Sequence, residues 1–197
     1  DADIEDESCE YESNYALEFD GVDDYVEIAN NDLLEPLTHN FTWSAWIKLN
    51  EIGIHNTVFD KRSATSVGFI MGINGGETNV VQGFINTGES GSLVNIYGAT
   101  SLSAGEWYHI AISGDRDENA IIYLNGGEDG QEDISVVNGN INNTQVMNIG
   151  KGSPVSNTAW GLFNGIIDEV QIWNRALTQE EIVSSISYVD VQDESLV

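Results

Sequence analysis

The chain is divided into short apolar segments of β type, each followed by a turn signal. The segments are rich in Val, Ile, Tyr, Phe and Trp and are separated by Gly, Asn and Asp. Such residues suit a pleated, half-buried strand, and their regular interruption by turn residues is typical of an all-β sandwich. Eleven segments are expected to be strands, too many for an immunoglobulin-like unit: residues 15–19, 25–28, 41–49, 57–60, 67–73, 80–85, 93–98, 106–113, 120–126, 144–150 and 162–173.

One segment near the C-terminus has the pattern of a helix instead. It is RALTQEEIVSSI, residues 175–186. Thr178 is the expected N-cap, and Glu181 follows three residues later, which is the spacing of a capping box. The sequence therefore predicts one short C-terminal helix.

Both ends of the chain differ from its centre. The first twelve residues contain seven acidic groups and only one strongly apolar residue, Ile4, so they cannot bury enough surface to offset their ordering entropy. We expect an acidic tail or linker over residues 1–14, one domain over 15–185 and a C-terminal linker over 186–197. The chain does not begin with Met and has no basic, apolar leader, so we expect a module of a larger, multidomain protein.

The charge balance restricts the partners. Thirty-three acidic residues face six basic ones, a net charge of −27, so nucleic acid and anionic lipid are repelled. There is no apolar run long enough to span a membrane, and membrane insertion is not expected. Cys9 is the only cysteine, which excludes an internal disulfide and a cysteine-built zinc site. Where carboxylates converge, such a chain attracts a hard cation such as Ca²⁺.

Several motifs, taken together, resemble a known family. They are YALEFDGVDDYVEI, FTWSAWIKL, GEWYHIAISGD, AIIYLNG, MNIG and LFNGIIDEVQIWNRALTQEEI. In order and spacing they are similar to the laminin G-like branch of the concanavalin A-like lectin/glucanase superfamily, from about Tyr15 to Val183. The resemblance implies a jelly-roll sandwich of two curved antiparallel sheets, with the first and last strands side by side.

The resemblance also implies a calcium site at one rim of the sandwich. Asp20 ends the first strand and Asp168 lies in the last one, so their pairing is expected to bring both carboxylates to that rim, with Asp23 or Asp24 adding an oxygen. Calcium takes six to eight oxygen ligands, and two carboxylates with turn carbonyls and water suit it. The alternative is that these Asp and Gly residues only build a turn.

A second acidic string, DRDENA, matches the start of a calcium-binding EF-hand loop. Asp115, Asp117 and Asn119 take its positions 1, 3 and 5, but Ala120 and Gly126 stand where Gly and Glu are required. The flanking segments are β-like, so we expect a hairpin turn.

Glycoside hydrolysis is a weaker hypothesis than a binding function. Glucanases of the superfamily carry Glu-x-Asp-x-x-Glu on one strand, and Glu18, Asp20 and Asp23 come close to it. However, the last residue is Asp, and Gly21 indicates a turn where the strand should continue, so a glycoside hydrolase with paired carboxyl groups is not favoured.

The histidines and the glycine-rich segments do not suggest catalysis. His39, His55 and His109 lie in different segments without a nucleophile motif, and we expect them to be structural or on the surface. The glycine-rich segments 72–76 and 124–130 lack the lysine of a phosphate-binding loop and are expected to be turns.

The tryptophans divide into two groups. Four lie within predicted strands and are expected to pack in the core or between sheets: Trp43, Trp46, Trp107 and Trp173. Trp160 differs, because it belongs to a loop-like run that enters the last strand beside the expected calcium rim, with Asn157 and Thr158 nearby. An exposed indole can stack on a sugar ring while polar neighbours bind its hydroxyls, although a plain surface tryptophan is the alternative.

These observations favour a calcium-dependent, non-catalytic, lectin-like adhesion module of a larger extracellular or cell-surface protein. Its expected partner is a glycan or polysaccharide. A structural or protein-binding spacer of the same fold is the alternative, because laminin G-like domains serve both purposes.

Overall fold

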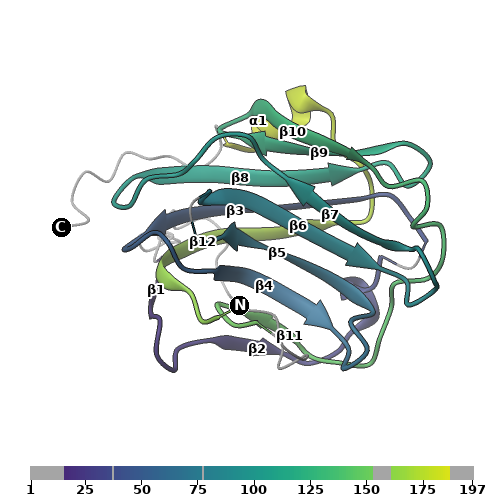
Figure 1. Cartoon of the computed structure of the whole chain (residues 1–197), viewed down its shortest axis with the longest axis horizontal. Helices are drawn as coiled ribbons and strands as arrows, with labels where there is room; N and C mark the ends of the chain where they lie inside the picture. Colours follow the sequence, from purple (N-terminus) through teal and green to yellow (C-terminus); the bar gives the residue numbers. More distant parts are fainter. Residues whose placement is uncertain (1–15, 37, 77, 153–160, 187–197) are drawn as a thin grey trace, which may run out of the picture.

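The computed structural model of the chain describes residues 16–36, 38–76, 78–152 and 161–186. Within these residues, twelve strands form two six-stranded antiparallel sheets that pack face to face, with a short 3-10 helix, η1 (Asp32–Leu34), and one α-helix, α1 (Gln179–Ile186) (Figure 1). The predicted all-β sandwich with one short C-terminal helix is confirmed.

Each sheet contains six strands, and strands that are neighbours in space are often far apart in the sequence. In spatial order, the first sheet contains β1 (Leu17–Asp20), β12 (Asn164–Trp173), β3 (Phe41–Leu49), β8 (Trp107–Gly114), β9 (Asn119–Leu124) and β10 (Gly127–Asp133). The second contains β2 (Val26–Ile28), β11 (Met147–Ile149), β4 (Asn56–Arg62), β5 (Gly68–Asn74), β6 (Val80–Asn86) and β7 (Leu93–Tyr97). The first strand lies beside the last, as predicted, with Leu17 opposite Ile167 and Asp20 opposite Asn164.

β10 was not predicted from the sequence. The expected turn over residues 124–130 is only Asn125–Gly126, both with positive φ (50° and 80°), and the chain then pairs back along β9. Two residues with positive φ form the tight turn whose twist suits a hairpin, and Asn-Gly is its preferred sequence. Residues 127–133 are acidic and rich in glycine, so their local preference for a strand is weak. They form a strand because they pair with β9, and this tertiary pairing overrides the local preference.

The core lies between the sheets and is centred on Trp43. Its indole is fully buried and stacks on Phe41 and Phe69, with ring centroids 4.0 and 4.8 Å apart. Phe59 meets it edge-on at 6.0 Å. Alternate residues of β3 face this core, so the residues between them face outward.

Helix α1 covers part of the outer face of the first sheet, near β9 and β10 (Figure 1). Ile182 packs there against Ala111 and Tyr123. The N–H of Thr178 donates to Oε2 of Glu181 at 2.9 Å, and the N–H of Glu181 donates to Oγ1 of Thr178 at 3.3 Å. The predicted capping box is confirmed.

Candidate functional site

The turn after β1 is built by aspartates. Oδ1 of Asp20 accepts the backbone N–H groups of Val22, at 2.7 Å, and Asp23, at 3.3 Å. The N–H of Asp20 donates to Oδ2 of Asp24 at 3.1 Å, and Gly21 has a φ of 76°, which glycine adopts without strain. The carboxylates therefore have a structural role in this turn.

The same turn can also hold a metal ion. Asp20, Asp23 and Asp24 are exposed, and each offers a carboxylate oxygen within 4.8 Å of the others. Oxygens that share one calcium ion, at about 2.3–2.6 Å from it, lie at most about 5 Å apart. The three carboxylates meet this condition, and their exposure leaves room for water as further ligands.

Asp168 does not join them. The β1–β12 pairing is as predicted, but its register places Asp20 opposite Asn164, four residues before Asp168. At about 3.3 Å per residue, the two aspartates are about 13 Å apart along the strand. The expectation that pairing brings Asp20 and Asp168 to one rim is wrong, and one ion cannot contact both.

Asp168 lies instead at a β-bulge in β12. It pairs with Trp46 of β3, and the register shifts before Gln171. Glu169 in the bulge has a φ of 48°, and its N–H donates to Oδ1 of Asp168 at 2.8 Å. Burial raises the pKa of the Asp168 carboxyl. Its observed role is to support a strained piece of backbone.

Asn164 connects the acidic turn, Asp20–Asp24, to the residues that follow β3. The acidic turn, Asn164, Asn50 and Glu51 together are called the rim below. Its Nδ2 donates to Oε1 of Glu51 at 2.7 Å, and its Oδ1 accepts from Nδ2 of Asn50 at 3.1 Å. Its backbone N–H donates to Oδ1 of the buried Asn56 at 2.8 Å. A Cβ on Gly21 would lie 2.9 Å from that of Asn164, so the turn packs closely against this residue. This network joins residues far apart in the chain and was not predicted from the sequence.

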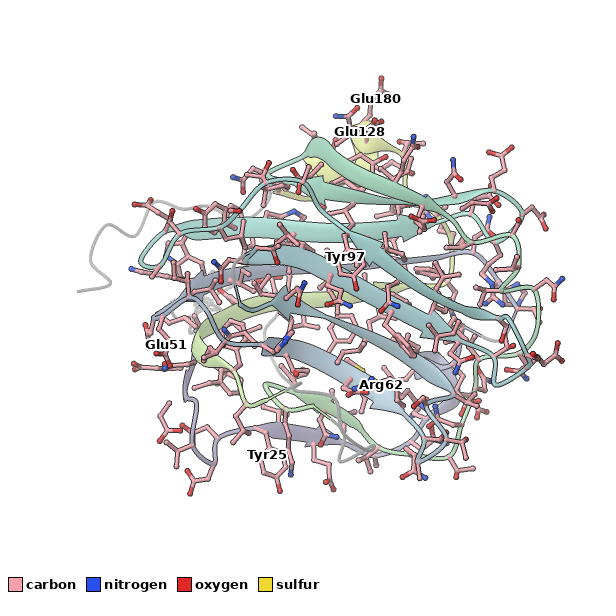
Figure 2. The ribbon with its side chains drawn as sticks, in the orientation of Figure 1. Tyr25, Glu51, Arg62, Tyr97, Glu128 and Glu180 are labelled. Carbon is pink, nitrogen blue, oxygen red and sulfur yellow. The ribbon has the colours of Figure 1, made fainter. Side chains whose placement is uncertain are left out.

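An exposed aromatic ring belongs to the same rim. Tyr25 directly follows the acidic turn and is 44% exposed, and Nζ of Lys151 lies 3.6 Å from its ring centroid. Such a cation–π contact holds the ring in place. Figure 2 shows Tyr25 at the lower edge of the molecule and Glu51 at the left side of the molecule. Tyr25 was not predicted as a site residue because it was counted within a strand.

Trp160, Asn157 and Thr158 lie outside the described residues. The residues that flank their segment are at the rim: the N–H of Gly152 donates to the carbonyl of Gly161 at 3.3 Å. Gly161 also bridges to Asn56, and Lys151 to Leu162. Gly152 and Gly161, the described residues on either side of that segment, are therefore close to Lys151 and Asn164.

The other tryptophans do not all pack as predicted. Trp43 is in the core, but Trp46 and Trp107 lie on the outer face of the first sheet, with ring centroids 6.4 Å apart. Trp173 is 36% exposed, so the expectation that it packs inside is wrong. The bulge in β12 precedes it and changes which way the following side chains face.

The remaining motifs are structural. DRDENA forms the predicted hairpin turn between β8 and β9, where Oδ1 of Asp115 accepts the N–H of Asp117 at 3.1 Å. His109 is buried on β8 beside Trp46, with 5.5 Å between the ring centroids, and burial lowers its pKa to about 4. His39 is exposed.

The outer face of the second sheet carries a further polar surface. Arg62 and Asp60 form a buried ion pair at 2.6 Å, and the guanidinium lies 5.3 Å from the ring centroid of Phe84. Nε2 of Gln82 donates to the hydroxyl of Tyr97 at 3.2 Å. Figure 2 shows Arg62 and Tyr97 over this sheet.

The described part of the chain contains no helix with the length and apolar character needed to cross a membrane.

Solved structures share this fold. A heptameric SAP-like pentraxin from Limulus polyphemus has a TM-score of 0.68 at 16% identity, covering 86% of this chain and 80% of the pentraxin. A candidate carbohydrate-binding protein from Bacteroides ovatus has a TM-score of 0.64 at 20% identity, covering 86% of this chain and 46% of that one. The ligand-binding domain of botulinum neurotoxin serotype D, in complex with N-acetylneuraminic acid, has a TM-score of 0.60 at 16% identity, covering 84% of this chain and 39% of that one.

At these identities the likeness shows the fold alone, and this chain spans less than half of the second and third proteins. No curated protein sequence matches the chain. The Laminin_G_3 family model, described as the concanavalin A-like lectin/glucanases superfamily, matches residues 20–183, more than four fifths of the chain. The chain belongs to this laminin G-like family of the concanavalin A-like superfamily.

Proposed function

We propose that the protein is a non-catalytic carbohydrate-binding module whose rim binds Ca²⁺ and a glycan. One observation carries the proposal: the carboxylates of Asp20, Asp23 and Asp24 converge within 4.8 Å, directly before the exposed ring of Tyr25. A metal and a stacking surface side by side are what a small lectin site needs.

Calcium fits the carboxylates better than softer metals. All three donors are hard oxygens, and the acidic turn contributes neither the histidine nor the cysteine that zinc and copper prefer. A divalent cation would also relieve repulsion among three crowded charges in a chain of net charge −27.

The surroundings of the turn suit a sugar. A pyranose ring can stack on Tyr25, whose ring is fixed by Lys151, while the polar groups of Asn50 and Glu51 lie on the same rim. We include Trp160, Asn157 and Thr158 in the proposed site, because Gly152 and Gly161, the described residues on either side of their segment, lie at this rim. Two proteins of the same fold are a candidate carbohydrate-binding protein and a domain in complex with N-acetylneuraminic acid.

The geometry of β1 supports a binding role over hydrolysis. β1 is an edge strand of four residues that ends at Asp20, so Asp23 falls in the turn and does not continue the strand face that Glu18 and Asp20 share. A glycosidase needs its two carboxyl groups fixed on either side of the scissile bond. We infer an adhesion module of a larger extracellular or cell-surface protein, with a linker on each side of the domain. The expected domain, residues 15–185, is extended by one residue because α1 ends at Ile186, so the proposed linkers are residues 1–14 and 187–197.

Binding to a panel of immobilised glycans, with Ca²⁺ and with EDTA, tests the proposal. We expect at least one glycan to bind in Ca²⁺ and to be lost both with EDTA and in the double variant Asp23→Asn/Asp24→Asn. Asp117→Asn, at an exposed aspartate in the β8–β9 turn, is the matched control and should bind as the wild type does.

Two results contradict the proposal. If no glycan on the panel binds, the alternative is favoured that the domain is a structural or protein-binding spacer of the same fold. Glycan binding that is unchanged by EDTA and by the double variant moves the site away from the rim, for example to the outer face of the second sheet around Tyr97.

A further inference from the structure

A hollow of about 550 Å³ lies at the end of the first sheet opposite the rim. Three connections line it: residues 38–40 before β3, Asp115 after β8 and residues 174–176 after β12. β3 runs from this end toward Asn50 at the rim, and its nine residues separate the two regions by about 30 Å. The volume is within the range of about 300 to 1,000 Å³ that is usual for small-molecule sites.

The walls of the hollow are fixed by hydrogen bonds to neighbouring loops and to β3. Oδ1 of Asn40 accepts the backbone N–H of Arg116 at 2.9 Å, and Nε of Arg116 donates to the carbonyl of Val137 at 2.6 Å. On the other side, Oγ1 of Thr42 donates to the carbonyl of Arg175 at 2.9 Å. A preformed site loses less entropy when it binds a ligand.

The lining offers both donors and acceptors. It contains a hydroxyl from Thr38 and side-chain amides from Asn40 and Asn174. The Asn174 amide forms no hydrogen bond with another described residue. Asp115 uses Oδ1 for the N–H of Asp117, while its Oδ2 accepts none from the described residues. Sugar hydroxyls, which both donate and accept, match such a set.

The charge of the hollow favours a neutral ligand. Nη1 of Arg175 donates to both carboxylate oxygens of Glu181 at 2.8 Å, so the charge of Arg175 is balanced. Asp115 then leaves the lining negative, in a chain of net charge −27. An anionic ligand is therefore repelled.

An exposed indole lies close to one of the residues that line the hollow. Trp173 directly precedes Asn174 in the chain, and its ring centroid lies 5.8 Å from the guanidinium carbon of Arg175, which is a lining residue. The exposed part of this ring can stack on the C–H face of a pyranose.

We infer that the hollow is a second carbohydrate site, which takes a neutral pyranose without a metal ion. Asp115 and Asn174 bind hydroxyl groups, and Trp173 stacks on the ring. The inference is independent of the metal-dependent rim, and each can fail without the other.

NMR titration of the ¹⁵N-labelled protein tests it, with D-glucose, D-galactose, D-mannose and N-acetyl-D-glucosamine as probes and EDTA present throughout. The indole N–H of Trp173 and the side-chain amide of Asn174 report on the hollow. We expect at least one sugar to shift both signals in a saturable way. Asn174→Ala should weaken that sugar's binding, measured at Trp173, by about three- to tenfold, the effect of one or two lost hydrogen bonds.

One matched variant completes the experiment. Asn138→Ala, at an exposed asparagine outside the hollow, should leave the affinity unchanged. The inference is overturned if none of the four sugars shifts Trp173, or if Asn174→Ala binds as tightly as the wild type. In a second series of titrations, Ca²⁺ replaces EDTA. If the sugars then shift only rim signals, the inference is overturned and the proposed function is supported.

Discussion

His109 should make the stability of the protein depend on pH. Its side chain is only 4% exposed, it packs against Trp46, and among the described residues its Nδ1 has no hydrogen-bond partner. Burial penalises the charged imidazolium, and this lowers the pKa from 6.5 to about 4. The unfolded chain therefore binds a proton at His109 more readily than the folded chain does.

The sign and size follow from this difference. A lowered pKa contributes stability that is complete above pH 6.5 and is lost as the pH falls toward 4. At about 1.4 kcal/mol per pKa unit, the complete loss is about 3 kcal/mol, and about 2 kcal/mol is already lost at about pH 5.

Urea unfolding at about pH 7.5 and about pH 5 measures the effect in wild type and in His109→Gln, which cannot titrate. We expect the wild type to lose about 2 kcal/mol more than the variant between the two pH values. The comparison is made within each protein, so any change that the substitution itself causes cancels. His39→Gln, at an exposed histidine, is the control and should behave as the wild type.

Equal losses in wild type and His109→Gln would refute the reasoning. A direct measurement does not depend on the variant: the imidazole C–H signals of His109 in the folded wild type should titrate near pH 4. A midpoint near 6.5 would show that the site is hydrated.

Three further predictions concern the metal, the bulge and the helix. Calcium at a hundredfold excess over its Kd should stabilise the protein by about 2.7 kcal/mol and raise Tm by about 5–10 °C, measured by calorimetry; an unchanged Tm on adding EDTA contradicts the metal site. Asp168→Ala should lose about 1 kcal/mol in urea unfolding, because Glu169 loses its acceptor, whereas Asp168→Asn keeps one and should stay near wild type; equal losses contradict the bulge role. Glu181→Ala should lower Tm by removing the capping box, with Glu180→Ala as the near-neutral control in thermal circular dichroism; equal effects contradict the cap.

Most of the sandwich could be predicted because strands and caps are local. The alternation of apolar and turn residues located eleven of the twelve strands, and the Thr178–Glu181 spacing located the helix. The missing strand, β10, is rich in Gly and acidic residues and forms only because the Asn125–Gly126 turn returns the chain along β9. The Asn-Gly pair was a usable signal for that hairpin.

The candidate site was predicted only in part. Asp20, Asp23 and Asp24 are close in sequence, and a turn held by their own hydrogen bonds keeps them close in space. Asp20 and Asp168 lie on neighbouring strands, β1 and β12. Strand order alone does not give the register, which places Asp20 opposite Asn164, four residues before Asp168.

Features that depend on neighbouring residues could thus be read from the chain alone: strand positions, the helix cap and the acidic turn. The rim network around Asn164, the hollow at the opposite end and the exposure of Trp173 emerged only with the folded chain. These depend on register, on a bulge and on loops that meet across the sheet. A shift of one residue in register reverses the face on which each side chain lies, and the sequence pattern near one strand does not contain that information.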